Sequence, residues 1–333
     1  MNDMVVTERR RLGRSGPEVS AIGLGCMSLS GVYGTSDDTA GIALIHRAID
    51  LGVDHFDSSD MYGWGQNEEL LGRALKDRRN GVVIASKFGQ TQRPGGANGV
   101  DGSPAYISQA CEASLKRLGV EVIDLYYQHR VDPAVPVEET VGAMARLVEQ
   151  GKVRHLGLCE ARPERIRRAH TVHPIAAVQS EFSLLYREEA TEIRKLTTDL
   201  GIAFVAYAPL GRSLLAGVVP DLNHLDAGDT RGRHPRFMGD NLAKNRALVE
   251  RIETIAEEKR CTPAQLALAW LSAQGPDVIP IPGTKRITRL EENLGALKVR
   301  LTPAEIDRIS AAIPVGASAG TRYPEGGMRG VYI

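Results

Sequence analysis

The sequence predicts an α/β fold, a single (β/α)8 barrel of the TIM type, and three observations support this. Short apolar runs alternate with longer amphipathic segments along nearly the whole chain, as strands and helices alternate in βα units. Eight such runs can be counted, which is the strand number of this barrel. The 333 residues suit one large unit, and no interdomain linker interrupts them. We therefore expect one domain, residues 1–333.

Each strand is expected where a short apolar run precedes a helical pattern. Capping signals mark several helices: Gly52 follows the helix at 37–51, and Pro104 begins the next-but-one helix. The expected strands are residues 19–24, 55–57, 82–86, 123–128, 153–158, 176–180, 203–207 and 278–281. The expected helices are residues 37–51, 68–76, 104–118, 137–149, 163–170, 188–200, 242–259, 263–272, 287–296 and 302–313.

Four segments depart from the alternation. Residues 90–103 are rich in glycine and residues 208–239 are polar, so both are expected to be long loops after strands, on the catalytic face of a barrel. The run 9–11 is three arginines, which we expect to be solvated. Residues 314–333 contain five glycines, so no stable regular element is expected there.

The composition bounds the function. Lysine plus arginine equals aspartate plus glutamate, at 41 each, which gives no electrostatic reason to expect nucleic acid or an anionic membrane as a partner. The four cysteines are scattered without a C-x-x-C pair, and no apolar signal segment or membrane span is apparent. We expect a cytoplasmic protein; the sequence leaves an oligomer possible.

Polar side chains stand at the ends of several expected strands. Asp57 ends the second strand, with Tyr62 five residues later; Lys87 follows the third strand and His129 the fourth. Strand ends converge on one face of a barrel. A tyrosine beside an ammonium group has its pKa lowered, a carboxylate can hold the lysine charged, and a neutral histidine can orient a carbonyl oxygen. The set predicts an acid that protonates a developing alkoxide.

Taken singly, each of these residues would more often be structural. Two other patterns in the sequence predict no functional site. Gly23-Leu24-Gly25 begins like a dinucleotide fingerprint, but the third glycine and an immediate helix are missing. His170 and His173 lack further ligands, so no metal site is expected.

Several segments resemble the aldo-keto reductase family. FDSSDMYGWGQNEELLGRAL is similar to its Asp, Tyr-Gly and Asn-Glu signature, while IASKFG and YYQHR resemble the segments that carry its lysine and histidine. VQSEFSLLYR, AYAPLGRS and IPIPGTKRITRLEENLGAL resemble its cofactor segments. The resemblance covers nearly the whole chain and is nearest to the bacterial and plant branch that includes perakine reductase and the potassium-channel β-subunits.

The resemblance implies an NAD(P)H-dependent oxidoreductase whose cofactor is NADPH or NADP+. Tyr62 would be the general acid, tuned by Asp57 and Lys87, and His129 would orient the carbonyl. Residues 314–333 would form a tail over the barrel mouth, near Met61 and Trp64, which with His129 would meet the substrate. The implied cofactor-binding residues are Gly25, Met27, Asp57, Cys159, Gln179, Tyr207, Ala208, Pro209, Leu210, Gly211, Arg212, Gly283, Thr284, Lys285, Arg289, Glu292 and Asn293.

The chain departs from the family pattern at the nicotinamide. Cys159 and Glu160 stand where the family commonly has Ser-Asn, which removes an amide donor and weakens a hydrogen bond. The resemblance predicts reduction of aldehydes or ketones to alcohols, with hydride from nicotinamide C4 and a small-molecule carbonyl compound as substrate. The alternative is a cofactor-binding redox sensor with negligible turnover. A hydrolase is disfavoured, because no paired catalytic carboxylates or metal ligands are apparent at the strand ends.

Overall fold

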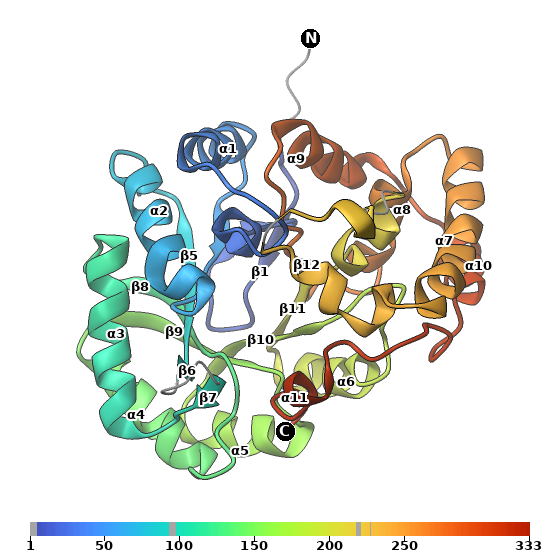
Figure 1. The fold of residues 1–333 in the computed structure, drawn as a ribbon. Coiled ribbons are helices and arrows are strands. Elements are labelled where there is room, and N and C mark those ends of the chain that lie inside the picture. Colours follow the sequence, from blue (N-terminus) through green and yellow to red (C-terminus); the bar gives the residue numbers. More distant parts are fainter. Residues whose placement is uncertain (1–4, 93–97, 218–220, 227) are drawn as a thin grey trace.

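Eight parallel strands curl into a barrel that helices surround (Figure 1), which confirms the predicted (β/α)8 architecture. The computed structural model describes residues 5–92, 98–217, 221–226 and 228–333. Neighbouring strands pair in the order β3, β4, β5, β8, β9, β10, β11, β12. The strands are β3 (Leu24–Gly25), β4 (His55–Asp57), β5 (Val83–Phe88), β8 (Ile123–Gln128), β9 (Val153–Cys159), β10 (Ile175–Glu181), β11 (Ala203–Tyr207) and β12 (Val278–Pro280).

The first and last strands meet at a seam that closes the sheet. The Gly23 amide donates to the Pro280 carbonyl over 3.0 Å, and the Gly25 amide donates to the Pro282 carbonyl over 3.3 Å. A Cβ on Gly25 would lie 2.7 Å from the Ile281 carbonyl oxygen, and one on Gly283 would lie 2.9 Å from the Gly25 carbonyl oxygen. The two backbones therefore approach more closely than any side chain permits.

Helices follow the strands and cover the outside of the barrel (Figure 1). Short polar caps begin several of them: Asp37 accepts from the Ala40 amide at α1, and Thr262 and Thr302 form capping boxes at α8 and α10. The helices are α1 (Asp38–Asp50), α2 (Gln66–Leu75), α3 (Pro104–Leu118), α4 (Val137–Glu149), α5 (Pro163–Val172), α6 (Ala190–Leu200), α7 (Asp240–Glu258), α8 (Pro263–Ser272), α9 (Ile287–Leu294), α10 (Pro303–Ala312) and α11 (Glu325–Met328).

A hairpin precedes the barrel, and it corrects the expected strand at 19–24. Strand β1 (Arg9–Arg11) pairs antiparallel with β2 (Glu18–Ser20), and only Leu24–Gly25 joins the barrel. Leu12 and Val19 pack in the apolar cluster inside the barrel. The Arg14 amide donates to the Gly201 carbonyl, just before β11 begins, so the hairpin lies at the end of the barrel where strands start.

The expectation that residues 9–11 are solvated is wrong for Arg10. Its side chain is buried, and its guanidinium donates to the carbonyl oxygens of Ser272 and Gly275 over 2.9 Å each, as well as to Val278. Three backbone acceptors near α8 and β12 and an ion pair with Glu8 at 3.3 Å thus compensate the buried charge.

The expected long loops contain short regular pieces. Strands β6 (Gln90–Gln92) and β7 (Asn98–Val100) form a hairpin in the glycine-rich segment, where residues 93–97 lie outside the described part. Segment 208–239 contains several 3-10 turns, and residues 218–220 and 227 lie outside the described part. The tail also has one short element, α11, which sequence reasoning missed.

Candidate active site

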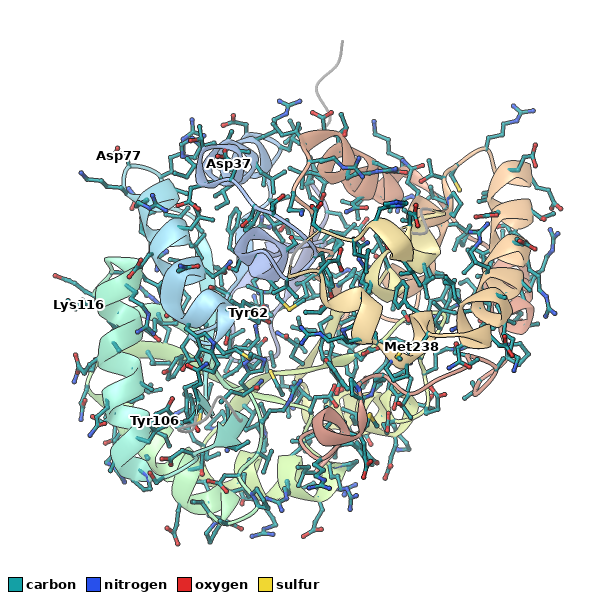
Figure 2. All side chains as sticks on the ribbon, in the orientation of Figure 1. Asp37, Tyr62, Asp77, Tyr106, Lys116 and Met238 are labelled. Carbon is teal, nitrogen blue, oxygen red and sulfur yellow. The ribbon has the colours of Figure 1, made fainter. Side chains whose placement is uncertain are left out.

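The four residues expected to carry the chemistry lie together at the strand ends. Asp57 is the last residue of β4, Lys87 is the next-to-last residue of β5, and His129 directly follows β8. Lys87 Nζ donates to an Asp57 carboxylate oxygen, to the Ser58 carbonyl oxygen over 2.7 Å and to the Tyr62 hydroxyl over 3.4 Å. The Tyr62 and His129 rings meet edge to face with centroids 5.8 Å apart. Tyr62 lies near the centre of the ring of helices (Figure 2).

A tight turn after β4 holds Tyr62 in place. Gly63 and Trp64 both have left-handed backbone angles, with φ of 58° and 52°, and Gly65 follows with φ of 103° before α2 starts. A left-handed tryptophan costs conformational energy and is a mark of functional turns. Asn67 on α2 fastens the turn, because it accepts from the Ser58 hydroxyl over 2.7 Å and donates to the Cys26 carbonyl over 2.8 Å.

Burial and the neighbouring charges together set the protonation states of the cluster. Burial raises the pKa of Tyr62, and although Lys87 lowers it, the net shift is upward. The expectation that Lys87 brings this pKa down to the working range is therefore wrong, because desolvation outweighs the ammonium charge. Burial would lower the pKa of Lys87, but Asp57 and Tyr62 raise it more. Burial, Arg130 and Lys87 lower the pKa of His129 well below its ordinary range. At neutral pH the site holds a phenol, an ammonium and a neutral imidazole.

Ser59 contacts His129, and sequence reasoning missed this contact. Its hydroxyl oxygen lies 3.0 Å from His129 Nδ1 and 3.4 Å from a carboxylate oxygen of Asp60, and it accepts from the Met61 amide over 3.3 Å. No sequence signal distinguishes such a serine from others in a loop. This contact couples the orientation of the Ser59 hydroxyl to the imidazole nitrogen that carries the proton.

On the opposite side of the mouth, the residue pair at the end of β9 is tied to the tail. Glu160 is buried and accepts from Arg322 over 2.8 and 3.0 Å, from the Tyr207 hydroxyl over 2.9 Å and from the Glu181 amide over 3.1 Å. Its carbonyl oxygen accepts from the Ile333 amide over 3.1 Å. Both the carboxylate and the backbone carbonyl of Glu160 therefore already have hydrogen-bond donors within the protein.

The neighbouring polar groups are also paired with one another. Glu181, at the end of β10, accepts from Arg212 over 3.1 and 3.3 Å and from Arg236 over 2.6 Å. Burial raises the pKa of Glu181, but the two arginines lower it more, to about 2. The Tyr207 hydroxyl also lies 3.2 Å from the Tyr323 hydroxyl. Cys159 is buried, and burial raises its pKa to about 12, so it is no thiolate nucleophile.

The segments expected to meet a nicotinamide cofactor lie around the same mouth. Gln179 on β10 donates to Asp57 over 2.8 Å. This bond links this side to the tetrad of Asp57, Tyr62, Lys87 and His129. After β11 the backbone turns sharply, with φ of 47° at Ala208, 58° at Arg212 and 88° at Ser213. Non-glycine residues with left-handed backbone angles are strained, and such residues are concentrated at ligand sites. Pro209, Leu210 and Gly211 lie in the same turn, and the Gly211 amide donates to the Ala208 carbonyl.

The expected adenosine segment lies beyond β12. Thr284 accepts at its carbonyl from Ser28, next to Met27, over 3.1 Å. Lys285 Nζ donates to the carbonyl oxygens of Tyr33 and Thr35 over 2.8 Å each. Arg289 forms an ion pair with Glu292, and Asn293 is buried. The glycine seam, the strained turn and this basic segment fit an elongated anionic dinucleotide.

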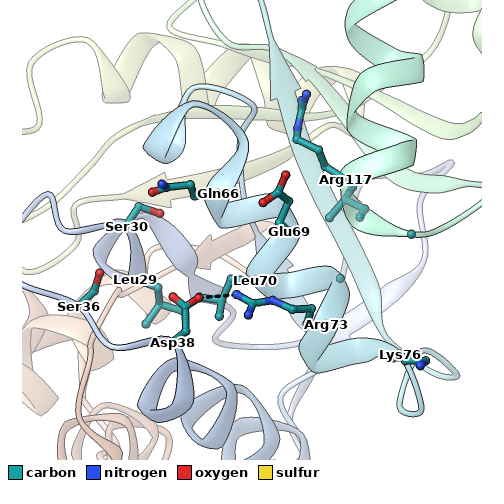
Figure 3. A pocket seen from close by; sticks show the side chains of 13 residues that line it. Leu29, Ser30, Ser36, Asp38, Gln66, Glu69, Leu70, Arg73, Lys76 and Arg117 are labelled. Carbon is teal, nitrogen blue, oxygen red and sulfur yellow. Dashed lines mark hydrogen bonds and ion pairs between the residues drawn. The ribbon is translucent and has the colours of Figure 1, made fainter.

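A separate groove lies outside this site, between α1, α2 and the end of α3 (Figure 3). It has a volume of about 960 Å³, and Asp38 and Arg73 pair across it. None of the tetrad residues lines it. Within the described residues, no group of three or more His, Cys, Asp or Glu side chains could hold a metal ion, and no helix is long and apolar enough to cross a membrane.

Comparisons with known proteins agree on one family. Residues 21–314 match the model of the Aldo/keto reductase family. The chain is 49% identical over 323 residues to "Probable aldo-keto reductase 1" of Glycine max, covering 95% of this chain and 92% of that protein. It is similar in structure to a glycerol dehydrogenase from Gluconobacter oxydans, with a TM-score of 0.82, 29% identity and coverage of 92% and 95%.

A second solved structure is the holo form of an aldo-keto reductase from Bacillus halodurans. The TM-score is 0.78 at 27% identity, with 96% of this chain and 99% of that chain covered. A thermostable aldo-keto reductase in complex with the inhibitor epalrestat has a TM-score of 0.74 at 29% identity, with coverage of 92% and 100%. These likenesses extend over the whole barrel.

Proposed function

Because this chain belongs to the aldo-keto reductase family and is an NAD(P)H-dependent oxidoreductase, we propose that it reduces aldehydes or ketones to alcohols with Tyr62 as the proton donor. The observation that carries the proposal is the Lys87 ammonium, which is held by Asp57 and lies 3.4 Å from the Tyr62 hydroxyl. The bound nicotinamide would supply the hydride to the carbonyl carbon. Glycerol dehydrogenase activity belongs to the Gluconobacter relative.

Each tetrad residue has a distinct task in this proposal. Tyr62 is neutral at working pH, so it donates a hydrogen bond to the carbonyl oxygen and passes its proton there as negative charge develops. The ammonium of Lys87 stabilises the resulting phenolate, and Asp57 keeps that ammonium charged and oriented. His129 is neutral and donates a second hydrogen bond to the same oxygen.

The test of the proposal is Tyr62→Phe. We expect kcat for a generic aldehyde such as 4-nitrobenzaldehyde to fall by at least ~100-fold, the size of a lost positioned acid, while the Kd of NADPH stays nearly unchanged. Near-normal turnover in this variant would remove Tyr62 from the mechanism. Tight cofactor binding with negligible turnover in the unaltered protein would favour the redox-sensor alternative.

NADPH is the proposed cofactor, in preference to NADH. Lys285 and Arg289 are held by other groups of the protein, whereas the Arg286 side chain has no hydrogen-bond partner within the described residues. A guanidinium can meet the 2′-phosphate with directed hydrogen bonds. Fluorescence titration should give tighter binding of NADPH than NADH, and Arg286→Gln should weaken NADPH binding by about tenfold without changing NADH binding. Equal affinities in the unaltered protein would contradict the preference.

Residues 314–333 are proposed to close the substrate side of the mouth. In support, the Arg162 amide donates to the Ile333 carbonyl over 3.0 Å, and Tyr323 reaches Tyr207. Met61 and Trp64 are proposed to line the opposite wall; Trp64 is exposed. Deleting residues 329–333 keeps Arg322 in place and should raise the substrate KM with little change in the Kd of NADPH. Unchanged substrate kinetics in a folded truncation would reject the lid.

The proposed location is the cytoplasm. All four cysteines are free, and three of them are buried, as is usual in a reducing compartment.

A further inference from the structure

One arginine at the barrel mouth differs from its neighbours in having no acidic partner. Arg212 and Arg236 both pair with Glu181, and Arg322 pairs with Glu160. Arg130 forms no ion pair with any carboxylate in the part of the chain that the structure describes. Its one side-chain hydrogen bond there runs from Nη1 to the His129 carbonyl oxygen over 2.9 Å. A guanidinium has five N–H donors, so most of them are left for a ligand.

The position of Arg130 puts this charge beside the reacting group. It follows His129 directly at the end of β8, and its side chain is half-buried. A Cβ on Gly330 would lie 3.5 Å from Arg130 Cδ, so the tail passes over the aliphatic part of the side chain. The guanidinium is thus enclosed between the catalytic histidine and the tail.

The electrostatics agree with this placement. Burial would lower the pKa of Arg130, but Tyr207, Tyr323 and Glu160 raise it more, so it stays charged. Glu160 and Tyr207 lie at the ends of β9 and β11 and Tyr323 lies in the tail, so the guanidinium is near this part of the mouth. A half-buried guanidinium interacts with an anion more strongly than an exposed one, because the local dielectric is lower.

We propose that Arg130 binds a carboxylate on the substrate, so that the preferred substrates are short oxo acids whose carboxylate lies a few bonds from the carbonyl. The carbonyl oxygen would meet Tyr62 and His129 while the carboxylate meets the fork of Arg130. This inference rests on the proposed carbonyl reduction. It adds the substrate class, which neither the tetrad nor the family requires.

The test compares an acid with its neutral ester. Reduction of 4-oxobutanoate and of its methyl ester is measured with the unaltered protein, Arg130→Gln and Arg130→Lys. The unaltered protein should have a KM for the acid at least ~10-fold below that for the ester. Arg130→Gln should lower kcat/KM for the acid by about 30-fold, mainly through KM, and change that for the ester by less than about threefold. Arg130→Lys should be intermediate, since it keeps the charge but lacks the fork.

Controls separate the possible failures. Arg300→Gln changes an exposed arginine outside the tail whose side chain is also 82% accessible, and it should leave both substrates unaffected. Equal losses for acid and ester in Arg130→Gln would mean that Arg130 acts through the His129 backbone, which overturns the proposal. If that variant does not fold, the acid-to-ester ratio of the unaltered protein decides alone, and equal KM values reject the proposal. Failure to reduce either compound, or any other aldehyde, would instead reject the proposed function.

Discussion

The two sides of the barrel mouth use polar side chains in opposite ways. On the side of β4, β5 and β8, Lys87 donates hydrogen bonds to the Asp57 carboxylate and the Ser58 carbonyl, which hold it in place. Its contact with the Tyr62 hydroxyl is long, at 3.4 Å. On the side of β9, β10 and β11, the Glu160 carboxylate accepts three hydrogen bonds from side chains and one from a backbone amide, and it holds the tail. The first side leaves donors for a substrate, whereas the second satisfies its own charges. We infer that chemistry depends on the first side and stability on the second.

The largest expected effect separates these two roles. Arg322→Met removes the partner of Glu160 and leaves a buried carboxylate that keeps only neutral donors. We expect the free energy of unfolding, measured in urea, to fall by about 3 kcal/mol, as when one member of a buried ion pair is lost. The kcat for a neutral aldehyde should stay within about threefold, because Arg322 makes no direct contact with the tetrad among the described residues. Any indirect effect there should be smaller than the loss of one neutral hydrogen bond.

Two further variants sharpen this prediction. The double variant Glu160→Gln, Arg322→Met removes both charges and should recover much of the lost stability. Arg329→Met, on the exposed part of the tail, should unfold like the unaltered protein. If Arg322→Met is fully stable but loses kcat, the assignment of stability to this side is wrong.

The same contrast explains what could be read from the sequence. Asp57, Lys87 and His129 stand at strand ends, so periodicity alone brings them to one face, and the family spacing adds Tyr62. The role of Glu160 depends on Arg322, which is 162 residues away and lies in a glycine-rich tail without periodicity. An ion pair between residues so far apart leaves no local pattern in the sequence from which it could be predicted.

The fold shows the same division. Long strands and helices with regular periodicity were predicted within a few residues, whereas the first barrel strand, Leu24–Gly25, is only two residues long. It is defined by backbone pairing at the seam rather than by side chains. A charged run predicts exposure for Arg10, but its side chain is buried and donates to three carbonyl oxygens outside its own hairpin.

A smaller effect is expected from Ser59, on the catalytic side. We infer that the Ser59 hydroxyl donates to His129 Nδ1, at 3.0 Å, rather than to Asp60, at 3.4 Å. The imidazole proton then lies on Nε2, where it can serve the carbonyl oxygen. Ser59→Ala should therefore lower kcat by about tenfold, the value of one hydrogen bond, with little change in KM. Ser59→Thr keeps the hydroxyl and should restore most of the rate.

Two readouts distinguish this positioning role from general loosening. The ¹⁵N shifts of His129 should report more of the Nδ1–H tautomer in Ser59→Ala, and unfolding in urea should change little. An unaltered kcat together with unaltered shifts would show that Ser59 does not position the histidine.

The smallest expected effect is a pH dependence of stability next to the tetrad. Burial, followed by the charge of Glu68, raises the pKa of Asp60 to about 7, against about 3.9 in an unfolded chain. The folded state therefore binds more protons between these values, and its stability falls as pH rises from about 4 to 7. Asp60→Asn removes this cost. Because Asp60 is partly accessible to solvent, we expect the free energy of unfolding of the variant to exceed that of the unaltered protein by only about 1 kcal/mol at pH 8, and by clearly less at pH 5. Urea unfolding at the two pH values measures the difference, with Asp77→Asn, on an exposed turn (Figure 2), as the matched control. An equal gain at both pH values would mean that Asp60 acts through packing rather than charge. A loss at pH 8 would mean that its carboxylate stabilises this side of the mouth, as Glu160 does on the other.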